Sequence, residues 1–279
     1  MIAAVEPARP ATKFSDLRKR ALSAAVLGPL ALGAIWLGAW PFKLMIALVG
    51  AVLAWEWVHL RGLHTRSWPG MLVPVAVLLA CLGAALEHPV LALGALLAGF
   101  GLASLAAPSG WRRFLAAGVP YIGLACVCLV FLRGNGEAGL DNVVFLVAIV
   151  WASDIGAYAA GRLLGGPKLW PAVSPSKTWA GFGGGLAAVL AVGALLAPAL
   201  HPGPVAPMLV MAALLGLATQ AGDLLESWIK RRCGAKDSSH LIPGHGGVLD
   251  RVDGLLAAAP VAALASLMLG PGLALWQWA

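Results

Sequence analysis

The charged side chains of this chain are concentrated between positions 223 and 253. Carboxylates and cations alternate there, although only 11% of the whole chain is charged. Clustered cations bind phosphate groups, and clustered carboxylates bind divalent cations such as Mg²⁺. The combination is typical of phosphoryl and nucleotidyl transfer, which depends on positioning and charge neutralisation more than on covalent chemistry. The aspartates are Asp223, Asp237, Asp250 and Asp253, and the cations are Lys230, Arg231, Arg232, Lys236 and Arg251.

A glycine-rich turn precedes the last two of these carboxylates. It reads P-G-H-G-G, with two glycines directly after His245. Glycines let the backbone approach a ligand closely and present N–H groups to it. Asp250 and Asp253 lie three residues apart, which places them on one face of the helix expected to begin there. Because Asp223 ends the preceding apolar segment and Asp250 begins the next, we expect both to reach the same depth and to bind one metal ion.

A polar stripe runs along the helix expected before that turn. At about 100° per residue, six of its polar side chains fall within an arc of about 120°. The stripe extends into the apolar segment, so a cavity filled with water explains it better than a solvated helix end does. The six residues are Thr219, Gln220, Asp223, Glu226, Ser227 and Lys230.

Two further carboxylates interrupt apolar segments. Ionisable groups in such segments are costly, so each is a functional candidate. Asp154 shares a helical face with Tyr158 and Gly161. For Asp154, a functional role and a structural pairing with a neighbouring helix both stay open. Glu56 lies between two tryptophans, and we expect it to anchor the chain at a membrane interface.

Membrane helices must position these residues. The 279-residue chain is 60% hydrophobic, whereas a soluble domain is about half apolar and about a quarter charged. A spanning helix needs about 20 predominantly apolar residues, and lipid does not satisfy exposed strand edges. We therefore predict an all-α polytopic membrane protein with about nine transmembrane helices. The expected segments are 21–40, 43–58, 69–86, 89–106, 116–133, 142–160, 180–198, 207–224 and 253–275.

The basic residues predict how these segments cross the membrane, because cytoplasmic loops carry an excess of Lys and Arg. With a cytoplasmic N-terminus, 17 of the 19 basic residues fall on the cytoplasmic side, and only Lys43 and Arg133 do not. An odd number of spans then places the C-terminus outside. This topology and attraction to anionic lipid headgroups explain the net charge of +7, so we expect no nucleic acid partner.

The polar residues also divide the chain into two regions. Residues 1–140 are expected to form about five N-terminal spans, and residues 141–279 form the expected catalytic region. The cytoplasmic loops of the second region are 161–179 and 225–252. The four cysteines lack the spacing of metal ligands, so we interpret them as ordinary thiols.

The stretch from Ser227 to Asp253 resembles the signature of the phosphatidate cytidylyltransferase (CDP-diglyceride synthetase) family. It carries a serine, K-R, K-D, P-G-H-G-G, D-R and a final aspartate, about a dozen specified residues over 27 positions. The preceding G-D-x-x-E-S, the segment around Asp154, and S-P-S-K-T-W-A-G-F from Ser174 are also similar to the family. Ala180 departs from the acidic residue that is usual at its position. The first 140 residues resemble the family only as apolar spans.

This resemblance implies an enzyme of phospholipid biosynthesis that transfers CMP from CTP to phosphatidic acid, giving CDP-diacylglycerol and pyrophosphate. It implies Mg²⁺ as cofactor, with a monovalent cation such as K⁺ as a second one. It also implies a homodimer in the bacterial inner membrane, with the active site facing the cytoplasm. The implied metal ligands are Asp223 and Asp250. The implied catalytic residues are these two with Lys230, Lys236, Asp237, His245, Arg251 and Asp253. The implied substrate-binding residues are Asp154, Ser174, Ser176, Lys177, Ser227, Arg231, Gly246 and Gly247.

Four alternatives stay open at this point. His245 either shuttles a proton or contacts a phosphate or the backbone, and we favour the contact. Enzymes that act on ether-linked isoprenoid lipids share the chemistry, and the sequence does not separate the two lipid classes. A transporter is disfavoured because the polar residues collect on one side of the membrane. A CDP-alcohol phosphotransferase is disfavoured because the D-G-x-x-A-R pattern is absent after Asp253.

Overall fold

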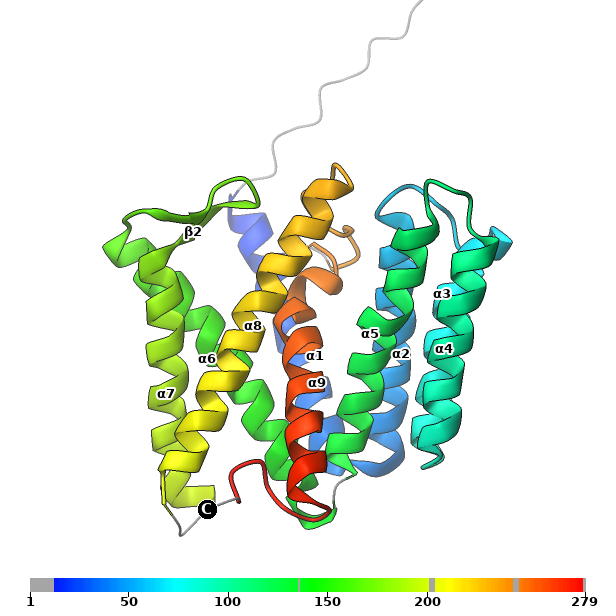
Figure 1. The fold of residues 1–279 in the computed structure, drawn as a ribbon. Helices are drawn as coiled ribbons and strands as arrows, with labels where there is room; N and C mark the ends of the chain where they lie inside the picture. The colour runs from blue at the N-terminus through cyan, green and yellow to red at the C-terminus, as the bar shows by residue number, and fades with distance from the viewer. Residues whose placement is uncertain (1–12, 135, 201–203, 243–245, 278–279) are drawn as a thin grey trace, which may run out of the picture.

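The computed structural model describes residues 13–134, 136–200, 204–242 and 246–277. Helices dominate this part of the chain, and they run side by side as one bundle (Figure 1). A short 3₁₀ turn, η1 (Gly136–Ala138), precedes α6. The α-helices are α1 (Lys13–Leu37), α2 (Ala39–His59), α3 (Trp68–Ala85), α4 (Pro89–Ala106), α5 (Arg112–Arg133), α6 (Gly139–Leu164), α7 (Trp179–Leu200), α8 (Ala206–Arg232) and α9 (Leu249–Leu269).

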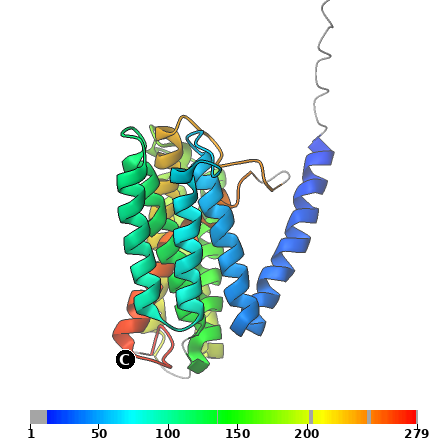
Figure 2. The ribbon, with the colours of Figure 1, turned by 90° about the vertical axis from the view of Figure 1, so that its right-hand side faces the viewer.

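The prediction of a polytopic helical membrane protein is confirmed. Within the described chain, eight helical segments, corresponding to α2 through α9, are long and apolar enough to cross a membrane. The apolar part of α1 is shorter and covers Ala25–Leu37. Figure 2 shows that α1 meets α2 at their connection and diverges from the bundle towards its own N-terminal end. The expected count of about nine thus corresponds to eight clear spans and one shorter apolar helix.

The segment predicted as a loop at 161–179 contains regular structure. Two short strands, β1 (Lys168–Trp170) and β2 (Ser174–Thr178), pair antiparallel as a hairpin. Gly165 and Gly166 have φ of +63° and +93°, a backbone conformation that favours glycine. The helix α6 therefore ends at this pair, and the chain turns into the hairpin. The hairpin is a small addition to an otherwise helical fold.

The chain after α9 turns back onto the bundle. The last span was expected at 253–275, but α9 begins at Leu249 and ends at Leu269. Gly270, with φ of +105°, follows the end of the helix. Trp276 is 1% exposed and packs edge-on against Phe145 of α6. Hydropathy did not separate this returning segment from the helix because both are apolar.

The connections divide between the two ends of the bundle. The hairpin, the described residues 233–242 and 246–248 between α8 and α9, and the α2–α3 and α4–α5 connections lie at one end (Figure 1). The α1–α2 and α3–α4 connections lie at the other end, together with the end of the chain that the figure marks as C. The connections that are rich in Lys and Arg, which the sequence analysis assigned to one side of the membrane, thus lie at one end of the bundle.

Close packing between α8 and α9 depends on a glycine beside the expected site. A Cβ at Gly222 of α8 would lie 2.6 Å from the Cβ of Ala257 and 2.7 Å from the carbonyl oxygen of Asp253, both on α9. Small residues at such contacts are typical of packing between membrane helices. Because Gly222 directly precedes Asp223, this contact also sets how closely Asp223 approaches the start of α9.

Replacing Gly222 with alanine is expected to separate α8 from α9. The added methyl group meets backbone, which cannot move aside, so we expect a loss of about 1–3 kcal/mol of stability. The measurement is the melting temperature of the purified protein in detergent. Gly94→Ala on α4 is the control, because a Cβ there meets no atom within 4 Å. Equal melting temperatures for the two variants would contradict the proposed tight contact.

Candidate active site

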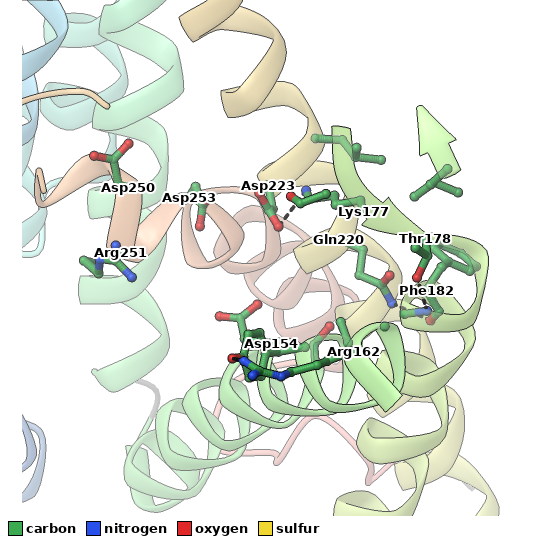
Figure 3. Close-up of a pocket in the computed structure, with 18 residues that line it drawn as sticks. Asp154, Arg162, Lys177, Thr178, Phe182, Gln220, Asp223, Asp250, Arg251 and Asp253 are labelled. Carbon is green, nitrogen blue, oxygen red and sulfur yellow. Dashed lines mark hydrogen bonds and ion pairs between the residues drawn. The ribbon is translucent and has the colours of Figure 1, made fainter. Parts of the chain in front are cut away.

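A cavity of about 580 Å³ lies among α6, the hairpin, α7, α8 and the start of α9 (Figure 3). Its size is within the range of about 300–1,000 Å³ that is usual for small-molecule sites. Carboxylates and cations from different elements face this common space. The polar residues that line it include Asp154, Arg162, Ser176, Lys177, Gln220, Asp223, Asp250, Arg251 and Asp253.

The carboxylate of Asp223 is paired with a cation from the hairpin. The Nζ atom of Lys177 on β2 lies 2.6 Å from Oδ2 of Asp223 on α8. The two side chains are 23% and 36% exposed, so water and ligands reach both of them. An ion pair of this kind is weak, and it can open when a phosphate or a metal ion offers a stronger partner.

The carboxylate of Asp250, by contrast, binds the chain around it. Its Oδ1 accepts a hydrogen bond from Lys230 Nζ at 2.7 Å, and its Oδ2 accepts one from the Gly247 N–H at 2.9 Å. The hydroxyl of Ser238 donates to Oδ2 at 3.1 Å, and the Ser238 N–H approaches both oxygens at 3.0 and 3.2 Å. In Figure 3, Asp253 lies between Asp250 and Asp223. Asp250 therefore holds the segment before α9 in place while it lines the cavity.

Lys230 lies between two carboxylates of low exposure. Its Nζ is 2.6 Å from Oε2 of Glu226, one turn earlier on α8, and 2.7 Å from Oδ1 of Asp250 on α9. Since Glu226 is 1% exposed and Lys230 is 13% exposed, this attraction acts with little screening by water. Lys230 does not belong to the described residues that line the cavity.

Glu56 of α2 lies at the same end of the bundle, and its expected role as an interfacial anchor is wrong. It is 0% exposed. It accepts hydrogen bonds from the N–H groups of Val248 and Leu249, at 2.8 and 2.6 Å, and from the hydroxyls of Ser238 and Ser239. The flanking tryptophans indicated an interface, but α2 turns Glu56 inward, towards the start of α9.

Comparison of the sequence with known proteins shows which family the chain belongs to. The cytidylyltransferase family matches residues 18–269 of this chain. The phosphatidate cytidylyltransferase of Brucella suis biovar 1 (strain 1330) is 42% identical over 252 residues, which cover 88% of this chain and 92% of that protein. The phosphatidate cytidylyltransferase of Pseudomonas aeruginosa is 41% identical over 265 residues, with 88% and 95% covered. That of Bacillus subtilis (strain 168) is 30% identical over 257 residues, with 88% and 96% covered. The chain belongs to the cytidylyltransferase family.

Membership of the cytidylyltransferase family confirms the resemblance and extends it along the chain. The signature from Ser227 to Asp253 covered only the C-terminal half, whereas the family match begins at residue 18. It therefore includes α2, which carries Glu56. The N-terminal helices are part of the family's fold and contribute a side chain to the surroundings of the cavity.

The structure brings seven of the residues that the resemblance implied to the wall of the cavity. They are Asp154, Ser176, Lys177, Asp223, Asp250, Arg251 and Asp253. The implied residues that do not line it are Ser174, Ser227, Lys230, Arg231, Lys236, Asp237, Gly246 and Gly247. His245 lies outside the described residues.

Two of the residues that do not line the cavity stabilise the hairpin and the end of α8. Ser174 Oγ lies 3.5 Å from Ser176 Oγ, at the limit of a hydrogen bond. Arg231 Nε donates to the carbonyl oxygen of Val173 at 3.3 Å, which links the end of α8 to the chain just before β2. Lys236 and Asp237 are exposed in the segment after α8.

Sequence reasoning missed Arg162 as a residue of the cavity. Its Nη1 donates to Tyr158 Oη at 2.7 Å, and both residues line the cavity from α6. The sixth span was expected to end at 160, so Arg162 counted only as a loop cation. Its position eight residues after Asp154 could have identified it, because that spacing keeps both on one side of a continued helix.

The donor chemistry of the cavity fits a Mg²⁺ ion that arrives with a phosphate ligand. Among the described residues, no group of three or more His, Cys, Asp or Glu side chains could hold a metal ion by itself. Mg²⁺ commonly uses one or two carboxylates and completes its shell with waters and substrate phosphates. Asp223, Asp250 and Asp253 line one cavity from two neighbouring helices. Such carboxylates suit an ion bound together with a nucleotide.

Replacing Lys230 with methionine tests its role between the two carboxylates. The variant leaves Glu226 and Asp250 without their shared cation, and breaking a buried ion pair in this way costs about 3–5 kcal/mol. We expect a lower melting temperature and less folded protein in detergent. Arg232→Met is the control, because Arg232 is exposed on the same turn. A stable Lys230→Met protein that has lost only substrate binding would show instead that Lys230 acts on the substrate.

Proposed function

We propose that this protein is a phosphatidate cytidylyltransferase, which transfers CMP from CTP to phosphatidic acid in phospholipid biosynthesis. The observation that carries the proposal is that bacterial proteins of that name align with 88% of the chain. The cavity supports it independently, because carboxylates and cations face one another there at one end of a membrane bundle. A lipid substrate can reach such a site from the bilayer, and a soluble nucleotide can reach it from water.

The proposed reaction forms one P–O bond and breaks another. A phosphate oxygen of phosphatidic acid attacks the α-phosphorus of CTP, and the bond from that phosphorus to the oxygen bridging the β-phosphate breaks. Pyrophosphate leaves with the electron pair of this bond, and CDP-diacylglycerol forms. A phosphate monoester has a second pKa of about 6, so the attacking oxygen is anionic at neutral pH without a strong general base.

The main task of the protein in this reaction is to offset repulsion between anionic reactants. Arg162, Lys177 and Arg251 line the cavity from three different elements. We propose that they contact phosphates of the two substrates from different sides. Cations that are already in place where charge develops lower the barrier, since they need no reorganisation during the reaction. The ion pair with Asp223 places Lys177 before a phosphate replaces its partner.

We propose that Mg²⁺ binds with CTP at Asp223 and Asp250, and that a monovalent cation such as K⁺ is a second cofactor. Bound Mg²⁺ supplies charge neutralisation for the reacting phosphates and for the departing pyrophosphate. Oδ1 of Asp250 becomes available when Lys230 gives up one contact, because Lys230 keeps Glu226 as a partner. Asp253, on the same face of α9, is a third carboxylate beside these two.

The transporter alternative receives less support from the arrangement of the cavity. The ion pair between Lys177 and Asp223 and the segment of α9 that carries Asp250 and Asp253 lie towards the end of the bundle that holds the hairpin. A transporter needs a binding site that opens alternately to both sides. A site built at one end suits an enzyme whose water-soluble substrate arrives from that end.

We propose that the end of the bundle with the hairpin faces the cytoplasm across the bacterial inner membrane. This end holds the connections that carry most of the basic residues, as cytoplasmic segments do. The N-terminus is then cytoplasmic, and the C-terminus lies outside. On the family resemblance we also propose a homodimer, which light scattering of the purified protein in detergent tests through its mass.

Purified protein in detergent is expected to convert CTP and phosphatidic acid to CDP-lipid and pyrophosphate in the presence of Mg²⁺. We expect Asp223→Asn and Asp250→Asn each to lower turnover at least about 100-fold, because losing a preorganised electrostatic group has effects of that order. Labelled CTP followed into the lipid phase measures this. Glu137→Gln is the control, since Glu137 lies exposed in η1 at the opposite end. Near-normal turnover in either aspartate variant removes that residue from the site.

The proposed topology predicts the activity of alkaline phosphatase fusions, because that enzyme folds only outside the cytoplasm. A fusion at the C-terminal end is expected to be active, and a fusion after residue 110, in the α4–α5 connection, to be inactive. Immunoblots of both fusions control for expression. The opposite pattern would reverse the orientation and place the cavity on the outer side.

A further inference from the structure

Glu56 is a buried carboxylate that the proposed reaction does not use. It lies in α2, 182 residues before the nearest of its partners in sequence, and it is 0% exposed. Its Oε1 accepts hydrogen bonds from Ser239 Oγ at 2.5 Å and the Val248 N–H at 2.8 Å. Its Oε2 accepts them from the Leu249 N–H at 2.6 Å and Ser238 Oγ at 3.3 Å. These four donors all belong to the segment that leads into α9.

Glu56 therefore caps α9 from another helix. The first N–H groups of a helix have no partner within it, and α9 begins at Leu249. A carboxylate at this position satisfies two of these N–H groups and is stabilised by the positive end of the helix dipole. Since Glu56 is carried by a packed membrane helix, its carboxylate is a fixed point for the start of α9.

Ser238 links this fixed point to the carboxylate of Asp250. Its hydroxyl lies 3.3 Å from Oε2 of Glu56 and 3.1 Å from Oδ2 of Asp250, and its N–H also donates to Asp250. A Cβ at Gly247 would lie 1.9 Å from Ser238 Oγ and 2.7 Å from Oε1 of Glu56. A side chain at residue 247 would therefore force Ser238 and Glu56 to move. A displacement of Glu56 therefore displaces the segment that orients Asp250.

We propose that Glu56 is a positioning residue for cytidylyl transfer: through its contacts with Ser238, Ser239, Val248 and Leu249 it sets the orientation of Asp250 and the level at which α9 begins. The inference rests on the proposed function. Glu56 does not line the described cavity, so it acts through Asp250 and not on a substrate. The N-terminal helices thereby contribute to the site without contacting the ligands.

A positioning role differs measurably from a role in stability alone. Glu56→Gln keeps the size and shape of the side chain but replaces one acceptor oxygen with an NH₂ group, which faces N–H donors. The residues that contact Glu56 must then shift, while Leu53 and Trp57 of α2 stay packed in the core. We expect kcat to fall by about 10- to 100-fold, the range found when groups that orient metal ligands are removed. We also expect half-saturation by Mg²⁺ to need a several-fold higher concentration.

The decisive experiment compares wild type, Glu56→Gln, Ser238→Ala and Glu87→Gln in detergent. Glu87 is an exposed carboxylate at the other end of the bundle, so its variant is the matched control and is expected to behave as wild type. Measured for each protein are the melting temperature, kcat, the KM for CTP and the Mg²⁺ dependence. Ser238→Ala removes only the linking hydroxyl and keeps Glu56, so it tests the same path if Glu56→Gln folds poorly. We expect it to lower kcat several-fold, by more than any loss of folded protein explains, with only a small decrease in melting temperature.

Three outcomes separate the possibilities. If the wild type is active and both Glu56→Gln and Ser238→Ala keep its kcat and its Mg²⁺ dependence, the inference is overturned and the proposed function stands. Activity losses that only follow the loss of folded protein also overturn it, because the role is then structural. A wild type that makes no CDP-lipid overturns the proposed function and, with it, the catalytic part of the inference. Hydrogen exchange at Val248 and Leu249, faster in Glu56→Gln, measures the cap independently of activity.

Discussion

The burial of carboxylates at one end of an apolar bundle is the constraint on which the rest of this structure depends. Glu56 and Glu226 are 0% and 1% exposed. A charge removed from water is costly unless charged or hydrogen-bonding partners replace the water. Lys230 is the partner of Glu226. The partners of Glu56 are Ser238, Ser239, Val248 and Leu249. The conformation of the chain that carries the family signature therefore depends on its contacts with these buried carboxylates.

The same constraint separates two kinds of acidic residue in the site. Asp250 already accepts hydrogen bonds from Lys230, Ser238 and Gly247, so its orientation is determined by the protein. Asp223 is more exposed and pairs with Lys177, which comes from a different element. One group is preorganised and the other can exchange its partner. A reaction between two anions benefits from both, because fixed groups lower the barrier and exchangeable groups admit the ligands.

Helix packing brings these groups to one place. The close contact at Gly222 holds α8 against α9, and the hairpin folds back to bring Lys177 to Asp223. The cavity has walls from α6, α7, α8 and α9, whereas Glu56 comes from α2 on the other side of α9's start. A helix of the N-terminal region, residues 1–140, thus contacts the C-terminal region, residues 141–279, at the first turn of α9.

Much of this architecture followed from the sequence alone. Hydropathy requires helices because lipid offers no hydrogen bonds to the backbone. The signature from Ser227 to Asp253, together with the similar segments around Asp154, Ser174 and Asp223, identified the family and seven of the residues that line the cavity. Glu56 was misjudged because its partners are distant in the chain, and Arg162 was misjudged because it lies beyond the expected end of its helix. The residues next to a single charged side chain in an apolar helix do not indicate whether that side chain faces the protein interior or the membrane interface. Only the tertiary structure decided that Glu56 points inward to cap α9, that Lys230 is shared by Glu226 and Asp250, and that the end of the chain folds back, because each depends on which helices become neighbours.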